Sequence, residues 1–211
     1  MARSRTAPGR PAGLPRIVAY DDGVDRDELR GRVDELASQP DRMRRRLVAL
    51  GALTARLAPH GIEPILVGGC ALEVYTDGGY TTGDVDLALA STPEVDRAFA
   101  DLGFTKRGRF WIRPELDLLF EAPAPAGLPG ETAPRTELDV DGLRVVVLGV
   151  EDLLIDRLRG WVHWKSDEDG RWAARLATLY VRKLDWDYLR SRVAGDAGET
   201  AALERLDRAT R

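Results

Sequence analysis

The sequence predicts an α/β (α+β) fold in which a small mixed β-sheet core is flanked by helices and followed by a helical C-terminal part. Before residue 60 and after residue 150, apolar residues recur at three- and four-residue intervals, which is typical of amphipathic helices. Between these segments, short apolar runs are separated by Gly, Pro and Asp, which is typical of strands and turns. This order predicts a mixed α/β centre near residues 62–148.

Composition limits the classes of protein to consider. The 211 residues suit one α/β unit with a helical extension, and 44% apolar with 31% charged residues allows a buried core. A formal net charge of -4 argues against a basic surface over the whole chain, although a local basic patch stays open. The one cysteine, Cys70, excludes an intramolecular disulfide and indicates a cytoplasmic protein. No apolar run approaches the roughly 18 residues of a membrane span, so no membrane partner is expected.

Four parts of the chain are expected. Residues 1–15 are rich in Arg, Pro, Gly and Ala, which predicts a flexible tail, and residues 16–60 are expected to hold N-terminal helices. Asp25 can cap a helix that runs to about residue 38, and a second helix is expected over 41–59. In that second helix Arg44, Arg45 and Arg46 are expected to face mostly solvent. Residues 61–149 form the expected core, and residues 150–211 the helical C-terminal region.

Within the core, we expect strands over 63–67, 84–89, 104–112 and 116–120 and helices over 70–75 and 92–102. Asp141-Gly142 predicts a hairpin turn between strands 136–140 and 143–148. After residue 150, we expect helices over 151–165 and about 172–180, a short helix capped by Asp185, and a polar tail after Gly195. The tryptophans of these helices are expected to lie in the helical core.

The chemistry is expected to lie between residues 61 and 120. Gly68 and Gly69 follow a strand and open a helix, so backbone N–H groups there can approach a phosphate without a side chain in the way. Asp84 and Asp86 alternate on a strand, so their carboxylates share one face and can hold hard cations such as Mg²⁺. Asp117, flanked by leucines in an expected strand, is either a base or a ligand of a second metal ion.

This pattern resembles the DNA polymerase β superfamily of nucleotidyltransferases. The pattern consists of two small residues after a strand, then a short helix, then Asp84-x-Asp86 in a second strand and Asp117 in a later strand. The Gly-Gly form with a Tyr-containing helix is similar to AbiEii-type and related toxin nucleotidyltransferases of bacteria. The resemblance covers residues 62–120 firmly and 150–190 loosely. Many relatives carry Ser at the second small position, where this chain has Gly69, which removes a hydroxyl contact to phosphate.

The resemblance implies transfer of a nucleoside monophosphate from an NTP to an RNA, protein or small-molecule acceptor, with Mg²⁺ or Mn²⁺ as cofactor. It implies that Asp84, Asp86 and Asp117 are catalytic metal ligands, and that Gly68, Gly69 and Lys165 bind the nucleotide. It also implies an antitoxin partner. The alternative is a catalytically silent nucleotide-binding or partner-binding module with the same core.

Two other Asp-x-Asp pairs are expected to be structural. Asp139-x-Asp141 runs into Gly142 and predicts a turn, whereas Asp185-x-Asp187 opens a helix, where acidic residues favour capping. Two separated histidines and one cysteine make no zinc set.

Overall fold

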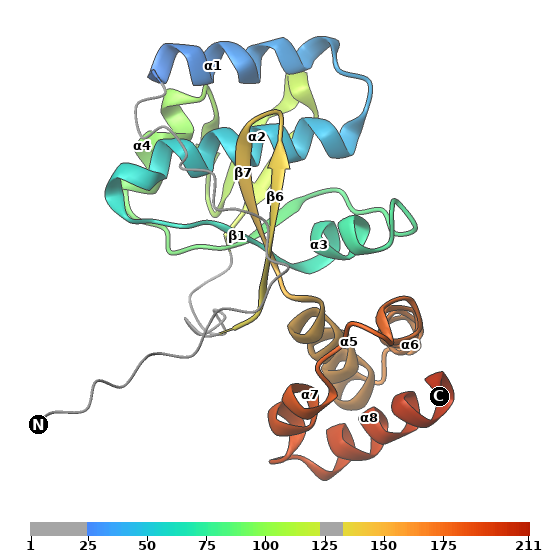
Figure 1. The fold of residues 1–211 in the computed structure, drawn as a ribbon. Helices are drawn as coiled ribbons and strands as arrows, with labels where there is room; N and C mark the ends of the chain where they lie inside the picture. The colour runs from blue at the N-terminus through green and yellow to red at the C-terminus, as the bar shows by residue number, and fades with distance from the viewer. Residues whose placement is uncertain (1–24, 123–132) are drawn as a thin grey trace, which may run out of the picture.

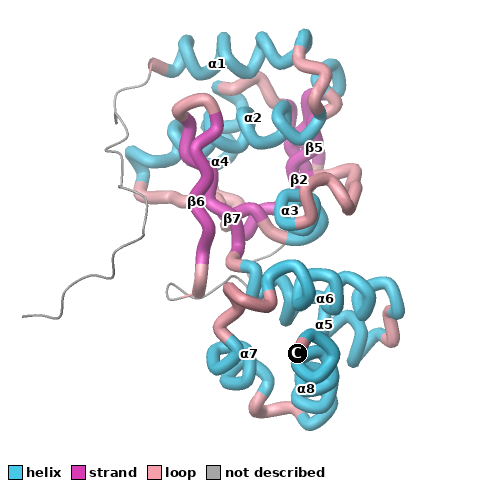
Figure 2. The backbone as a smooth tube through the Cα atoms, turned by 45° about the vertical axis from the view of Figure 1, so that its right-hand side comes forward, coloured by secondary structure: helices cyan, strands magenta, loops and turns pink. Residues whose placement is uncertain are grey.

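The computed structural model describes residues 25–122 and 133–211, and it confirms the predicted mixed α/β architecture (Figure 1). The expected tail of residues 1–15 lies outside the described residues. Helices α1, α2 and α4 cover the sheet on one side, and helices α5 to α8 gather below it, next to α3 (Figures 1 and 2). The helices are α1 (Arg26–Asp34), α2 (Arg42–Leu57), α3 (Gly68–Tyr75), α4 (Pro93–Asp101), α5 (Val150–Trp164), α6 (Asp167–Tyr180), α7 (Trp186–Val193) and α8 (Ala197–Thr210).

One sheet of seven strands runs through the upper part, in the order β3-β4-β5-β2-β1-β7-β6. β1 pairs parallel with β7 and β2 pairs parallel with β5, whereas the other neighbours are antiparallel, so the sheet is mixed. The strands are β1 (Ile65–Leu66), β2 (Val85–Ala88), β3 (Thr105–Arg107), β4 (Phe110–Arg113), β5 (Leu118–Glu121), β6 (Arg135–Val140) and β7 (Leu143–Leu148). The edge strand β3 is fully exposed, whereas β7, inside the sheet, is almost fully buried, as burial on both faces requires.

Side-chain caps are found at the predicted starts of four helices. The carboxylates of Asp25, Asp41 and Asp185 accept hydrogen bonds from the first turns of α1, α2 and α7, and the Thr92 hydroxyl does so for α4. Each cap satisfies a backbone N–H that has no partner within its helix.

Two predicted elements differ from the structure. The strand expected over 104–112 is two strands, β3 and β4, because Gly108 turns the chain with a φ of +62°. The polar tail expected after Gly195 is helix α8, which Asp196 caps and whose apolar residues Ala202, Leu203 and Leu206 pack into the core. An aspartate three residues before Glu199 was the missed helix-start signal.

The helical part packs through close approach of α5 and α6. A Cβ on Gly160 would lie 2.4 Å from the Asp169 carboxylate, and one on Gly170 would lie 2.9 Å from the Trp161 ring. The prediction that the tryptophans lie in the helical core is wrong for Trp164, which is 81% exposed at the end of α5.

Tyrosines join the helical part to the sheet. Tyr75 of α3 donates its hydroxyl hydrogen bond to the Leu148 carbonyl at the end of β7, and Tyr180 of α6 donates to the Tyr75 carbonyl. The rings of Tyr75 and Tyr180 also meet edge to face, with centroids 5.6 Å apart. α6 is therefore fixed beside α3, the helix that opens with the two glycines.

Candidate functional site

Three carboxylates lie close together where the parallel strands β2 and β5 pair inside the sheet. Asp84 precedes β2, Asp86 lies within it, and Glu121 ends β5. Oxygen atoms of the three side chains lie within 4.8 Å of one another. The parallel register pairs Asp86 with Glu121, and alternation along β2 turns Asp84 to the same face. Three oxygen ligands at this spacing match the preference of Mg²⁺ or Mn²⁺ for carboxylates.

The two glycines bring the start of α3 against this cluster. Gly68 has a φ of +62°, and a Cβ there would lie 2.3 Å from Oδ2 of Asp86, so only glycine fits. The backbone N–H of Gly69 donates a hydrogen bond to the Asp86 carboxylate. A Cβ on Gly69 would also lie 3.0 Å from atoms of Tyr80 and Thr82. The structure thus brings Gly68, Gly69, Asp84 and Asp86 together.

Helix α2 positions Asp84 through the loop that precedes it. The guanidinium groups of Arg42 and Arg46 donate to the Thr82 carbonyl, at 2.9 and 2.5 Å. The Thr82 hydroxyl in turn donates to Oδ1 of Asp84 at 2.7 Å. The prediction that Arg46 faces solvent is wrong, because its side chain is 1% exposed and pairs with Glu73 at 3.0 Å.

Asp84 and Glu121 raise the cost of ionising Asp86. Two unit charges at 4.8 Å repel by roughly 3 kcal/mol in an effective dielectric of about 20. Burial, followed by the charges of Asp84 and Glu121, raises the pKa of Asp86 to about 6, against the lowering effects of the Gly69 N–H and Arg157. A divalent cation between the three groups would replace this repulsion by attraction.

Asp117 was predicted to be the third carboxylate, but it lies outside the group formed by Asp84, Asp86 and Glu121. It ends a short 3₁₀ turn with a φ of +53°, so the strand begins only at the next residue. Its side chain is 63% exposed and pairs with Arg42 at 3.0 Å and with Arg45 at 3.5 Å.

Glu121 was not singled out from the sequence. It follows the apolar run of β5, where a glutamate is easily interpreted as a solvated strand end, yet it is only 8% exposed. Its position opposite Asp86 depends on pairing between strands 35 residues apart, and periodicity within one strand does not encode that pairing.

Two arginines reach this region. Arg109, in the turn between β3 and β4, pairs with Glu121 at 3.0 Å and keeps 66% of its side chain exposed. Arg157 of α5 is half-buried, pairs with Asp156 and Asp169, and lowers the pKa of Asp86 by its charge. Cations therefore approach the carboxylates both from the sheet edge and from the helical part.

Lys165 was predicted to bind the nucleotide. It ends α5 in a left-handed conformation with an exposed side chain, and its ammonium donates to the Val162 carbonyl at 2.8 Å. Eight residues separate it from Arg157, which is roughly 12 Å along a helix. Arg157 is the cation of α5 whose charge acts on Asp86.

A second group with metal-ligand chemistry lies between α5 and α8. Nε2 of His163 lies 2.8 Å from Glu199 and 3.9 Å from Asp196, which caps α8. Arg159 also pairs with Glu199, at 3.1 Å. Because an arginine and an imidazole already share the buried Glu199, this group is accounted for as an ion-pair network that fixes α8.

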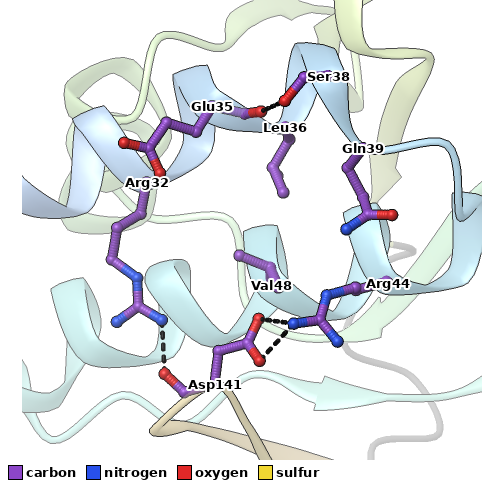
Figure 3. A pocket seen from close by; sticks show the side chains of 8 residues that line it. All are labelled: Arg32, Glu35, Leu36, Ser38, Gln39, Arg44, Val48 and Asp141. Carbon is purple, nitrogen blue, oxygen red and sulfur yellow. Dashed lines mark hydrogen bonds and ion pairs between the residues drawn. The ribbon is translucent and has the colours of Figure 1, made fainter.

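A polar pocket of about 260 Å³ lies between α1, with the 3₁₀ turn after it, and α2 (Figure 3). Nη2 of Arg44 donates to both carboxylate oxygens of Asp141 there, and Arg32 donates to the Asp141 carbonyl. These contacts hold the β6–β7 turn on α1 and α2. None of the three clustered carboxylates lines this pocket, and we interpret it as a structural contact between the β6–β7 turn and the N-terminal helices.

Comparison with known proteins supports the fold. No protein-family model and no curated protein match the sequence. Among solved structures, the chain is similar to the crystal structure of an antigenic nucleotidyltransferase-like protein from Paracoccidioides brasiliensis, with a TM-score of 0.51 and 17% sequence identity. The match covers 78% of this chain and 93% of that chain. At this identity the likeness shows the fold, which is nucleotidyltransferase-like.

Within the described residues, every helix is too short or too polar to cross a membrane.

Proposed function

We propose that this protein is a metal-dependent nucleotidyltransferase that moves a nucleoside monophosphate from an NTP to an acceptor. The observation that carries the proposal is the carboxylate group Asp84, Asp86 and Glu121 against the glycine-led start of α3. In the reaction, an acceptor oxygen forms a bond to the α-phosphorus and the bond from that phosphorus to the β-phosphate oxygen breaks. Pyrophosphate leaves, and the acceptor proton passes to a base and then to water.

The three carboxylates fit Mg²⁺ or Mn²⁺. Their oxygens converge within 4.8 Å, and burial together with the charges of Asp84 and Glu121 raises the pKa of Asp86, an effect that a bound cation would oppose. Asp84, Asp86 and Glu121 would hold the cation, which supplies positive charge that neutralises the triphosphate. Glu121 takes the place expected of Asp117, and Asp117 instead holds Arg42 and Arg45 beside the Thr82 loop.

The chain's own groups bind and orient the nucleotide. Gly68 and Gly69 leave the backbone at the start of α3 open, and its N–H groups with the positive end of the helix dipole favour phosphate. Arg157 contributes charge from α5, the role expected of Lys165. Glu121 is the carboxylate that accepts the acceptor proton in this scheme, because it ends its strand beside the open turn of Arg109.

Label transfer tests the proposal. The protein is incubated with each α-³²P-labelled NTP, Mg²⁺ or Mn²⁺, and RNA, protein or small-molecule acceptors. We expect transfer that Asp86→Asn and Glu121→Gln reduce at least about a thousandfold, since charged ligands of this kind stabilise the transition state. The matched control is Asp187→Asn, which removes an acid that is 95% exposed in another Asp-x-Asp pair. Equal transfer by Asp86→Asn and the control would reject the site.

The same assay separates the silent-module alternative, because that alternative predicts Mg²⁺-dependent NTP binding without transfer. A toxin–antitoxin role and a cytoplasmic location are further parts of the proposal. The first is supported by the Gly68-Gly69 resemblance and the second by the lone buried thiol of Cys70. For a toxin, we expect expression of the protein to arrest growth. The arrest should require Asp86, and co-expression of a neighbouring gene should relieve it.

A further inference from the structure

Helix α6 and the turn after it form a surface of uncompensated positive charge. Residues 170–184 contain four cations, Arg171, Arg175, Arg182 and Lys183, and no Asp or Glu. All four side chains are exposed. Within residues 25–122 and 133–211 none of the four forms an ion pair, although most arginines described there do. An unpaired basic segment in a chain of net charge -4 needs a physical reason.

Two of the cations share one side of the helix, and two follow it. Arg171 and Arg175 lie four residues apart on α6, whereas Arg182 and Lys183 lie in the turn after its last residue, Tyr180. The side of α6 opposite Arg171 and Arg175 carries Ala173 and Ala177, which are fully buried. The four cations therefore form a solvent-facing set, which we call the α6 stripe.

The α6 stripe lies next to the candidate active site. Trp172, adjacent to Arg171, meets Tyr80 edge to face with ring centroids 5.2 Å apart. Tyr80 belongs to the loop that carries Thr82 and Asp84, and α6 lies below α3 and that loop in both views of the fold (Figures 1 and 2). A polymer that follows the stripe is thereby brought beside the carboxylates.

The chemistry of the α6 stripe favours a nucleic acid. Guanidinium groups bind phosphate in two-pronged geometry, so exposed arginines without acidic partners suit successive phosphates of a strand. Trp164, three residues before α6 and 81% exposed, offers a ring on which a base can stack. A membrane surface fits less well, because an interfacial helix needs a broad open apolar face, whereas Ala173, Leu176 and Ala177 of α6 are buried and Leu179 is the large apolar side chain it exposes.

We infer that the α6 stripe binds the phosphate backbone of a single-stranded RNA acceptor and directs its end to the carboxylate site. This inference rests on the proposed function for the transfer step alone, because RNA binding itself is measured without a nucleotide. It names the acceptor class among the RNA, protein and small-molecule acceptors.

The test is fluorescence anisotropy with a short labelled single-stranded RNA of mixed sequence, titrated with the full chain between about 0.05 and 0.3 M salt. The variant is Arg171→Ala/Arg175→Ala/Arg182→Ala. The control is Arg97→Ala/Arg208→Ala/Arg211→Ala, which removes the same charge from arginines that are each 71% exposed and ion-paired elsewhere. We expect the variant to bind at least about tenfold more weakly and the salt slope to fall by about 2, at roughly 0.7 per lost phosphate contact.

Each outcome decides the inference. RNA binding that the variant and the control share equally overturns it. So does stripe-dependent binding to polyglutamate or to anionic lipid vesicles when RNA does not bind. Binding of a non-hydrolysable NTP analogue with Mg²⁺ is measured on the same proteins: stripe-dependent RNA binding without nucleotide binding keeps the inference and refutes the proposed function, whereas nucleotide binding without RNA binding refutes the inference alone.

Discussion

Replacing Asp86 by Asn should stabilise the metal-free protein while removing activity. The folded-state pKa of Asp86 is raised from 3.8 to about 6. Between these values the folded state holds a proton that the unfolded state has lost, so the free energy of unfolding falls as pH rises through this window. Above about pH 6 the whole penalty is present. The difference between these two pKa values corresponds to about 3 kcal/mol, and solvent screening of the partly exposed carboxylate reduces this to about 1–2 kcal/mol.

The neutral amide of Asn removes that penalty and still accepts the Gly69 hydrogen bond. In EDTA at pH 7.5, calorimetry should show a Tm about 2–8 °C above wild type, at roughly 2–4 °C per kcal/mol for a chain of this size. The difference should vanish near pH 4. Mg²⁺ or Mn²⁺ should raise the Tm of wild type more than that of the variant. A variant Tm equal to or below wild type at pH 7.5 in EDTA, with Asp187→Asn unchanged, would show that Asp86 is not under electrostatic strain.

Three further perturbations test other parts of the structure. Gly68→Ala should destabilise the protein by about 1–3 kcal/mol and abolish Mg²⁺-dependent NTP binding, because the added Cβ clashes with Asp86 and the φ of residue 68 is positive. Calorimetry measures the binding, and unchanged nucleotide affinity would contradict phosphate binding at the start of α3. Arg109→Ala should tighten Mn²⁺ binding about three- to tenfold without nucleotide, because Glu121 loses its competing cation, and weaker Mn²⁺ binding would instead make Arg109 part of the metal site. The pKa of the Cys70 thiol is raised to about 12, mainly by burial, so it should react with a thiol reagent at the rate of unfolding; rapid reaction in the native state would show that α3 opens locally.

The parts of the fold that follow from local chemistry could be predicted from the sequence. Asp25 and Asp41 cap helices through hydrogen bonds that span two or three residues, and Asp141-Gly142 turns a hairpin through positive φ angles at both positions. Gly68 belongs to the same class in its positive φ, which a short strand–helix turn requires, whereas its close contact with Asp86 depends on strand pairing. The caps, the hairpin turn and this φ need no knowledge of distant residues.

The features that depend on pairing across the chain could not be predicted. Arg46 was expected in solvent because it stands in a run of arginines, yet its partner Glu73 lies 27 residues later and buries it. A buried charge of this kind persists only with its partner, since removing one member typically costs about 3–5 kcal/mol. Sequence periodicity identifies the face of a helix, but it does not identify what packs against that face.

The third carboxylate shows how one register decides a site. Asp117 and Glu121 both flank the apolar run of β5, and simple alternation would turn both to the face of Asp86, because they are four residues apart. The left-handed turn at Asp117 starts the strand one residue later, and the pairing of Val85 with Phe120 then places Glu121 opposite Asp86. Comparing the single variants Asp117→Asn and Glu121→Gln therefore tests this strand register. Loss of divalent-ion binding, measured by calorimetry, should follow the Glu121 substitution, and loss that follows the Asp117 substitution alone would contradict the strand pairing on which the proposed site depends.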